Sequence, residues 1–369
     1  MRVLHIYKDY PPIFGGIENH LQVLAEGQAA RGHEVTVLVT NPAGVRTEVD
    51  VENGVRVIRA GRLATIASTP LSAAFAGQLR GQQPEIAHQH YPYPFGDVVH
   101  ALCGRARRTL ISYHSDIVRQ KGLLRFYAPM LRRSLERADG IIASSPRYVE
   151  TSAFLPPHAS KCTVIPYGID LTRFTSADPA QVAAIRAQYG TPLVLFVGRF
   201  RYYKGLEYLI RAMSRIAGHA LLIGRDTTTR RSELERIAAE SGVSGRVHFL
   251  SEPSVDLPAY YHACDLFVLP SVERSEAFGI VQIEAMAAGK AVVCTELGTG
   301  TSYVNQDGVT GRVVPPKDAE ALVAAICELL RDVALLGSLG AAARLRAQAE
   351  FDADVMVNRV LALYQTTLS

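Results

Sequence analysis

Short apolar segments alternate with longer amphipathic segments along this chain, and the whole series occurs twice. Short apolar runs bounded by turn residues are typical of buried strands, and the amphipathic segments between them are typical of crossover helices. The alternation therefore predicts parallel sheets covered by helices, an α/β architecture. We expect strands at 2–7, 34–40, 85–89, 108–113, 140–143, 193–198, 220–223, 247–250, 266–269 and 291–294, and helices that include 18–31 and 206–217.

The repeated series predicts two domains, each with a doubly wound, Rossmann-like sheet. A chain of 369 residues with 48% hydrophobic residues is long and apolar enough to fill two cores. A polar stretch at 170–192, which contains two prolines and a glycine, marks the boundary. We place an N-terminal domain at 1–170 and a C-terminal domain at 190–350.

Charge, cysteines and hydropathy exclude several classes of protein. The net charge of +4 is too small to indicate a nucleic-acid partner. The five cysteines show no C-x-x-C spacing and are typical of buried thiols in a reducing compartment. No apolar run reaches the roughly 18 residues that span a bilayer, and the chain opens as a strand rather than as a signal peptide. We expect a cytoplasmic protein whose only membrane contact is at its surface.

Two glutamates, Glu276 and Glu284, stand eight residues apart between an apolar strand and a helix. This spacing is slightly more than two helical turns, so both carboxylates can point at one cavity. Paired carboxylates suit the hydroxyls of a ribose or a hexose. An arbitrary pair of glutamates is usually a solvated surface feature. Here the neighbouring Phe278 and Gly279 and the small residues at 285–289 are not typical of an exposed helix, which favours a sugar site.

Five segments in order along the chain resemble the retaining glycosyltransferases of family 4, which have the GT-B fold. Each segment alone is weak evidence, but five in order are specific. The resemblance implies two Rossmann-like domains with a cleft between them, and a final helix at 351–369 that crosses back onto the N-terminal domain. The five segments are 10–18 (YPPIFGGIE), 114–116 (HSD), 164–170 (VIPYGID), 198–205 (GRFRYYKG) and the two glutamates with seven residues between them.

The first strand-to-helix turn contains Gly15 and Gly16. Glycines let a ligand approach the backbone closely, and the helix that follows offers its N-terminal amides to an anion such as a diphosphate. From these residues alone, a plain glycine-rich turn is equally consistent. A dinucleotide dehydrogenase would carry G-x-G-x-x-G here, which this chain does not. Glu18 matches the acidic position of the family.

Arg199 and Lys204 follow the first strand of the second series. That position is the carboxyl edge of the expected sheet, where open α/β folds bind ligands. Arginine and lysine can neutralise a nucleotide diphosphate as its bond to the sugar breaks. Basic residues in a tyrosine-rich loop are also common surface charges, but their match to the family segment favours donor binding. Arg201 is not at a fixed position of that segment.

His114 ends an apolar strand and begins the His-Ser-Asp segment. The resemblance places it near the anomeric carbon and the hydroxyls of the donor sugar, where an imidazole can bond a hydroxyl or share the charge of a departing phosphate. Asp116 either orients His114, takes part in acceptor binding or caps the next helix. By the same resemblance Glu276 contacts the donor sugar, and Glu284 contacts the nucleotide ribose.

His88 and His90 alternate along one strand and therefore share a face. Together with His114 they could hold a metal, but no cysteine or carboxylate completes a ligand set. We predict no metal, and we assign His90 and Tyr91 to the acceptor side. The only D-x-D sequence, at 352–354, opens the final helix, where carboxylates favour the helix dipole.

The segment 119–137 contains six cations interspersed with large apolar residues. This pattern fits an element that lies in a membrane interface and binds anionic lipid. An ordinary amphipathic helix packed on its own sheet is an equally good interpretation. A polyprenyl-linked or lipid acceptor would explain an element at the membrane interface.

The resemblance implies a metal-independent retaining glycosyltransferase that needs no cofactor besides its nucleotide diphosphate sugar. The segments around His114 and Glu276 are similar to bacterial mannosyltransferases of exopolysaccharide and O-antigen assembly. We therefore expect transfer of mannose from GDP-mannose to a hydroxyl of a glycan or a polyprenyl-diphosphate-linked acceptor, by front-face attack in an ion-pair-like transition state. The alternatives are a UDP-glucose or UDP-N-acetylglucosamine donor, a nicotinamide-dependent dehydrogenase or epimerase, and a catalytically silent sugar-nucleotide binding protein.

Overall fold

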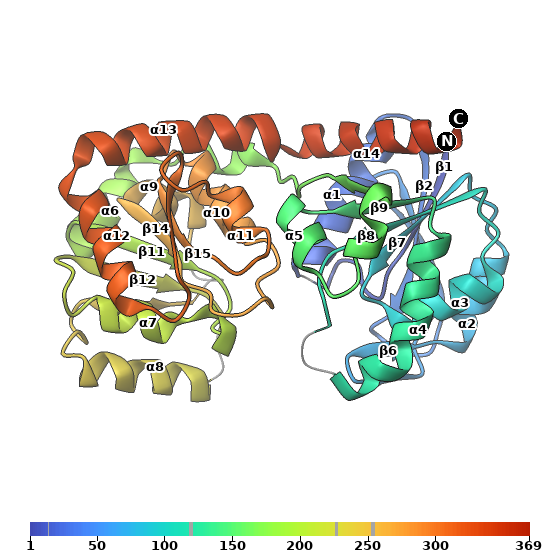
Figure 1. The fold of residues 1–369 in the computed structure, drawn as a ribbon, viewed down its shortest axis with the longest axis horizontal. Coiled ribbons are helices and arrows are strands. Elements are labelled where there is room, and N and C mark those ends of the chain that lie inside the picture. Colours follow the sequence, from blue (N-terminus) through green and yellow to red (C-terminus); the bar gives the residue numbers. More distant parts are fainter. Residues whose placement is uncertain (14, 118–120, 226–227, 252–254) are drawn as a thin grey trace. The chain divides into compact units, whose positions relative to one another are not determined.

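A computed structural model describes all of the chain except residues 14, 118–120, 226–227 and 252–254. The described residues form two compact units (Figure 1). The N-terminal unit comprises Met1–Ile169 together with Ala353–Ser369, and the C-terminal unit comprises Asp170–Asp352. Both have the mixed α/β architecture that the alternation of segments predicts.

The N-terminal unit is built on an eight-stranded sheet with the order β10-β9-β8-β7-β1-β2-β4-β3. All neighbours pair in parallel except β3 and β4, which are antiparallel. A separate hairpin is formed by β5 and β6. The strands are β1 (Arg2–Ile6), β2 (Glu34–Asn41), β3 (Glu48–Glu52), β4 (Val55–Gly61), β5 (Ala64–Ile66), β6 (Thr69–Leu71), β7 (Ile86–Tyr91), β8 (Arg108–Tyr113), β9 (Gly140–Ala143) and β10 (Cys162–Val164).

Two core clusters lie on opposite faces of β1, because successive side chains of a strand alternate. One contains Leu4 and Ile6 with buried residues of α2 and α3. The other contains Val3 with apolar residues of β7, β8, β9, α1 and α14. The helices of this unit are α1 (Gly16–Ala30), α2 (Ala73–Arg80), α3 (Pro94–Cys103), α4 (Lys121–Arg137), α5 (Pro146–Thr151) and α14 (Ala353–Leu368), with the 3-10 turn η1 (Pro156–Lys161).

The C-terminal unit contains a six-stranded sheet in which every neighbouring pair is parallel. Its order, β13-β12-β11-β14-β15-β16, is 3-2-1-4-5-6 in chain order, the common dinucleotide-fold order. The direction of the order reverses between β11 and β14, and ligands bind at the carboxyl ends of strands at such a point. The strands are β11 (Leu193–Val197), β12 (His219–Ile223), β13 (Val247–Leu250), β14 (Leu266–Leu269), β15 (Val292–Thr295) and β16 (Gly311–Val314).

Helices connect these strands, and the short ones near the carboxyl edge carry the candidate site. They are α6 (Pro179–Tyr189), α7 (Leu206–Ala212), α8 (Thr228–Glu240), α9 (Leu257–Ala263), α10 (Ile280–Ala287), α11 (Thr301–Val304), α12 (Ala319–Arg331) and α13 (Val333–Glu350), with the 3-10 turns η2 (Leu171–Phe174) and η3 (Tyr202–Lys204). No helix in the described part of the chain combines the length and the apolar character that a bilayer crossing needs.

The observed strands follow the expected ones closely, and 108–113, 140–143, 247–250 and 266–269 match at both ends. Two regions differ from the sequence prediction. The stretch 48–71, for which no element was expected, forms β3 to β6. The stretch 170–192, expected as a polar boundary segment, contains η2 and α6, and both belong to the C-terminal unit.

Candidate functional site

The candidate site of the C-terminal unit lies in the loops that follow β11 and β14, at the point where the strand order reverses. Glycines allow these loops to approach each other. Gly205 has a φ of +64°, and a Cβ there would collide with the carbonyl of Pro270. A Cβ on Gly224 would likewise collide with the carbonyl of Gly198. The backbone that carries Lys204 therefore lies directly against the end of β14.

Lys204 and Glu276 are both 8% exposed and form an ion pair. The Lys204 Nζ lies 2.5 Å from the Glu276 Oε2, which also accepts a hydrogen bond of 2.9 Å from the Ser271 hydroxyl. Two of the residues that the sequence singles out thus share one buried charge cluster. A diphosphate bound here would compete with Glu276 for the ammonium group of Lys204.

The loop around Glu276 is held in shape by its own backbone and by the segment 297–301. The Thr299 hydroxyl donates to the carbonyl of Glu276 at 2.8 Å, and the Gly300 amide donates to the carbonyl of Ala277 at 2.8 Å. Phe278 is buried. Gly279 precedes α10 with a φ of +78°, and a Cβ there would lie 2.7 Å from Leu269 Cδ2. This residue must be glycine, so the loop that presents Glu276 has one well-defined path into α10.

Glu284 and Arg199 have different surroundings. Glu284 is half-buried on α10 and accepts a 2.6 Å hydrogen bond from the Tyr261 hydroxyl of α9. Arg199 is exposed in the loop after β11. Arg199 and Arg201 of this loop are therefore exposed to solvent, whereas Lys204 is buried beside a carboxylate.

In the N-terminal unit, Gly15 and Gly16 begin α1, directly after the loop that follows β1. Glu18, in the first turn, is buried, and a Cβ on residue 15 would collide with its carboxylate. A side chain at position 15 would therefore require the Glu18 carboxylate to move. An anion that approached the first amides of α1 would also meet this carboxylate, a repulsion that the sequence prediction of a diphosphate site does not include.

His114 follows β8 and is buried between two partners. Its Nδ1 lies 2.7 Å from the Tyr167 hydroxyl, and its Nε2 lies 2.9 Å from the Nδ1 of His90. Burial holds the pKa of His114 well below its usual range, so the ring is neutral at pH 7. Both ring nitrogens are in use in this arrangement. A sugar hydroxyl can reach one of them only by replacing a present partner.

Of the three residues that the sequence assigns to acceptor binding, His90 and Tyr91 lie in the interior and Asp116 is half-buried. His90 is fully buried behind His114, and the Tyr91 ring is stacked on Tyr113 at 4.4 Å. The Asp116 carboxylate accepts 2.8 Å hydrogen bonds from Tyr113 and Ser152. Direct contact of His90 or Tyr91 with an acceptor is incompatible with this burial, because strand β7 is covered on both faces. Asp116 stabilises the end of β8.

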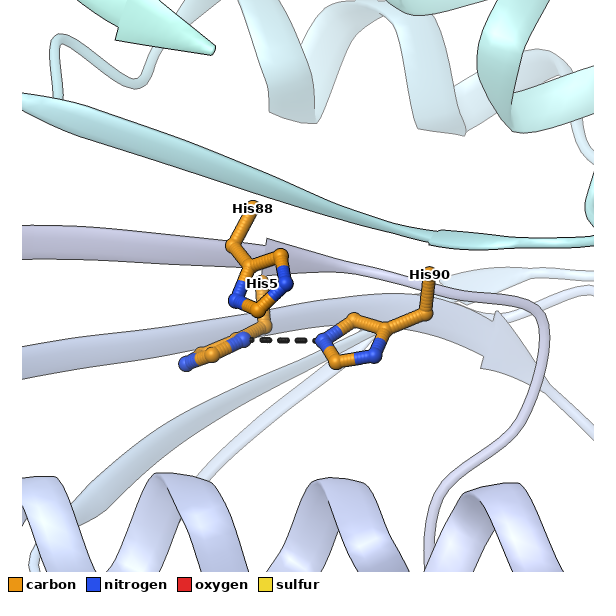
Figure 2. A group of neighbouring side chains, drawn as sticks. All are labelled: His5, His88 and His90. Carbon is orange, nitrogen blue, oxygen red and sulfur yellow. Dashed lines mark hydrogen bonds between the residues drawn. The ribbon is translucent and has the colours of Figure 1, made fainter. Parts of the chain in front are cut away.

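Two groups of three buried histidines could hold a metal: His20 with His90 and His114, and His5 with His88 and His90, the group drawn in Figure 2. His5 Nδ1 lies 3.0 Å from His90 Nε2, which fits a hydrogen bond and is closer than the roughly 3.3 Å between two ligands of a tetrahedral zinc ion. His88 is bonded at both nitrogens, to Tyr364 at 2.6 Å and to Ser112 at 2.7 Å. These contacts account for every ring nitrogen of the group in Figure 2, and the absence of a metal stays a prediction. The alternation of His88 and His90 is the signal that finds part of this cluster; His5, His20, Gln28 and Tyr364 carry no such signal.

Helix α4 covers most of the basic segment; Arg119 and Gln120 lie outside the described residues. Phe126 of α4 is 85% exposed. An apolar groove beside it is lined by side chains of α3, α4 and the β5–β6 hairpin, among them Ile66, Pro94, Val98, Leu124 and Met130. One face of α4 packs on its own unit through Leu131 and Leu135, so the ordinary amphipathic helix and the exposed apolar patch are both present.

Comparison with known proteins agrees with this geometry. One family model, described as Glycosyltransferase Family 4, matches residues 14–173, and another, described as Glycosyl transferases group 1, matches residues 191–332. The chain is 38% identical to an O-antigen chain mannosyltransferase C of Escherichia coli over 371 residues, covering 100% of this chain and 99% of that protein. It is 37% identical to a D-rhamnosyltransferase of Pseudomonas aeruginosa, covering 87% and 84% of the two chains.

A third relative is a GDP-mannose-dependent alpha-(1-6)-phosphatidylinositol monomannoside mannosyltransferase of Mycolicibacterium smegmatis, 31% identical over 93% of this chain and 92% of that one. Among solved structures, a sucrose-phosphate synthase from Thermosynechococcus elongatus has a TM-score of 0.77 at 26% identity, covering 99% of this chain and 98% of the other. The family models, the full-length relatives and the two Rossmann-like units show that the chain belongs to glycosyltransferase family 4 and is a hexosyltransferase of the GT-B fold.

Proposed function

We propose that this glycosyltransferase transfers mannose from GDP-mannose to a hydroxyl of a glycan or polyprenyl-diphosphate-linked glycan, with retention of the anomeric configuration and without a metal. The observation that carries the proposal is the cluster of Arg199, Lys204 and Glu276 where the strand order reverses between β11 and β14. A nucleotide diphosphate sugar combines the charges and hydroxyls that these groups bind. The names of the Escherichia coli and Mycolicibacterium smegmatis relatives support mannose and, in the second case, GDP-mannose.

In the proposed mechanism the protein positions the donor and neutralises its leaving group. Arg199 grips the diphosphate from the solvent side, and Lys204 moves part of its charge from Glu276 to the phosphates as the glycosidic bond breaks. Glu276 and His114 hold hydroxyls of the donor sugar, and Glu284 holds the ribose. Because Arg199 and Lys204 supply positive charge, the proposal needs no divalent ion and no cofactor. Front-face attack by the acceptor hydroxyl follows, since no second carboxylate is assigned to the anomeric carbon.

The membrane is part of the proposal as well. An acceptor that carries a polyprenyl chain is held at a bilayer, and Phe126 with the arginines of α4 provides apolar and cationic contacts for a surface-bound enzyme. We therefore propose that the enzyme acts in the cytoplasm at the inner face of the membrane.

The decisive experiment is transfer by the purified chain from a panel of donors, with and without EDTA. The panel contains GDP-mannose, a GDP-D-rhamnose donor because of the Pseudomonas aeruginosa relative, UDP-glucose and UDP-N-acetylglucosamine. We expect turnover with GDP-mannose that survives EDTA, and NMR of the product should show the anomeric configuration of the donor. Faster turnover with a UDP-sugar would contradict GDP-mannose as the donor. Loss of activity in EDTA with rescue by Mn²⁺ would contradict the metal-free mechanism. Reduction of NAD would show that the protein is an oxidoreductase instead of a glycosyltransferase.

A further inference from the structure

One face of the N-terminal sheet changes character along its strands. Its amino-terminal half is apolar and packs on α14, through Val3, Ile86, Leu110 and Ile142. Its carboxyl-terminal half carries polar side chains instead, and all of them are buried: His5, His88, His90, Ser112 and His114. The strand register places these polar residues side by side, because His5 pairs with His88 and His90 pairs with Ser112. Buried polar groups need hydrogen-bond partners, so this half of the face must contain a network.

The network is one continuous chain of hydrogen bonds. Starting at the candidate site, Tyr167 bonds His114 at 2.7 Å, His114 bonds His90 at 2.9 Å, and His90 bonds His5 at 3.0 Å. His5 then bonds the amide oxygen of Gln28 on α1 at 2.8 Å. The amide nitrogen of Gln28 continues the chain to Tyr364 of α14 at 3.3 Å, and from there it runs through His88 to Ser112. Figure 2 shows the central link between His5 and His90.

Such a chain has a direction, because a neutral imidazole has one N–H donor and one bare acceptor nitrogen. Burial lowers the pKa of His5 to about 4 and holds those of His90 and His114 well below the usual range, so these rings are neutral at pH 7. Gln28 fixes the direction, since its oxygen accepts from His5 and its nitrogen donates to Tyr364. His5 and His90 must then each carry the proton on Nε2, and so must His114. The Nδ1 of His114 is left as an acceptor, filled by the Tyr167 hydroxyl.

We propose that Gln28, His5 and His90 are positioning residues that act through His114, holding it in the Nε2–H tautomer so that its Nδ1 accepts a hydrogen bond from a donor-sugar hydroxyl in place of Tyr167. The exchange is chemically balanced, because one hydroxyl donor replaces another and no proton moves. This inference rests on the proposed function for the identity of the ligand. The tautomer itself is a property of the free protein.

The first test is NMR of the full chain labelled with ¹⁵N-histidine, in which long-range ¹H–¹⁵N correlations distinguish the two neutral tautomers. We expect His5, His90 and His114 all to be protonated at Nε2. Protonation of His114 at Nδ1 in the free protein would overturn the inference, and it would do so whatever sugar the enzyme uses.

The second test breaks the chain on the far side of His5. Gln28→Met removes the amide that sets the direction at similar volume, so we expect a mixture of His114 tautomers and about a tenfold fall in kcat, the size of one hydrogen bond, with little change in donor KM. The matched control is Ser112→Ala. Ser112 lies two residues before His114 in the chain but at the opposite end of the series of hydrogen bonds, so this variant should keep both the tautomer and kcat.

These variants separate positioning from a structural role. A merely structural effect would make Ser112→Ala at least as harmful as Gln28→Met, and that result would overturn the proposal, as would an unchanged His114 tautomer in Gln28→Met. If Gln28→Met does not fold, His5→Phe breaks the adjacent link and takes its place. If the wild type transfers no sugar from any donor, the proposed function fails while the tautomer measurement still decides the inference.

Discussion

At the scale of single residues, the cations after β11 carry the strongest prediction about catalysis. Arg199→Ala and Lys204→Ala should each lower kcat by about 10²-fold, because each removes a charge that stabilises the leaving diphosphate. Arg201→Ala is the matched control, since Arg201 is an exposed arginine in the same loop without an assigned contact to the donor. Steady-state kinetics with a fixed donor and acceptor measures all three.

The structure adds a distinction between the two cations. Lys204→Ala leaves the buried Glu276 without its ion-pair partner, which costs a few kcal/mol of stability, whereas Arg199→Ala changes a side chain that is exposed to solvent and should cost less. Thermal unfolding should therefore separate the two variants even where their kinetics agree. Wild-type turnover in both variants would contradict the proposal that this loop binds the diphosphate of the donor.

The two glutamates should divide binding from chemistry. Glu284→Gln should raise the donor KM and leave kcat nearly unchanged, because the ribose that it is proposed to hold does not change during the reaction. Glu276→Gln should lower kcat, because charge redistributes at the donor sugar and at Lys204, its ion-pair partner. A lower kcat in Glu284→Gln with a higher donor KM in Glu276→Gln would mean that the roles of the two glutamates are the reverse of those proposed.

What the sequence predicts at this scale depends on how local the pattern is. Lys204, Glu276 and Glu284 stand in short segments with fixed spacing, and the structure brings the first two together. The direct partners of His114 are His90 and Tyr167, the rest of its hydrogen-bond chain comes from positions 5, 28 and 364, and no local pattern links these positions. The sequence placed His90 and Tyr91 on the acceptor side because it could not show that β7 is covered on both faces.

At the scale of elements, the turn into α10 allows a clean test of packing against backbone strain. Gly279 and Gly242 both have a positive φ, of +78° and +68°. A Cβ at Gly279 would strike Leu269 and Gln282, whereas a Cβ at Gly242 would meet nothing within 4 Å. Gly242→Ala should cost about 1 kcal/mol of backbone strain, and Gly279→Ala about 2–4 kcal/mol because overpacking is added.

Urea unfolding of both variants measures this difference, and kinetics adds a second readout. Gly279→Ala displaces the loop of Glu276 and should also lower kcat, whereas Gly242→Ala should not. Equal destabilisation by the two substitutions would mean that the loop before α10 accommodates a side chain.

Helix α4 carries the proposed contact with the membrane. Phe126→Ser should reduce co-sedimentation of the protein with vesicles of anionic lipid several-fold, because Phe126 is 85% exposed beside basic side chains. Leu345→Ser on α13 is the control, since Leu345 is 67% exposed on the C-terminal unit. Equal loss in both variants would indicate nonspecific adsorption, and no loss in either would leave α4 as an ordinary packed helix.

Most elements were predictable because strands in parallel sheets are continuous apolar runs. In the stretch 48–71, β3 and β5 are exposed and carry no such run, whereas β4 is buried and the sequence prediction missed it. Helix α6 was read as a boundary for a similar reason, since Ile185 is its only buried residue.

At the scale of the whole molecule, the chain passes between the two units twice, and the segment before the first passage and the helix after the second both contribute to the histidine network. Tyr167 stands three residues before Asp170, where the C-terminal unit begins, and Tyr364 lies on α14, which begins directly after that unit ends. The Gly168 amide also contacts Met356 Sδ of α14 at 3.1 Å. The repeated series of strands predicts two units, but only the structure shows that the segment before the first connection and the helix after the second share one polar core.

That polar core should make the N-terminal unit sensitive to acid. Burial lowers the pKa of His5 to about 4 and of His20 to about 3, and it lowers those of His88, His90 and His114 as well. In the unfolded chain these groups titrate near 6.5, so as the pH falls from 6.5 toward 4 the unfolded state binds protons that the folded state refuses. His5 alone removes about 3 kcal/mol over this range. Asp97 acts in the opposite direction, because burial raises its pKa to about 7 and the folded unit then takes up a proton first.

The network therefore outweighs Asp97, and stability should be full above pH 6.5 and fall steeply between pH 6.5 and 4. Hydrogen exchange followed by mass spectrometry, corrected for the intrinsic rate at each pH, measures this within one molecule. Protection of β1 and β7 should drop between pH 7.5 and pH 5, while β11 and β12 serve as the internal control, because the histidines of the C-terminal unit, His219, His248 and His262, are only partly buried. Equal loss of protection in both units would mean that the buried histidines do not set the acid limit of this enzyme.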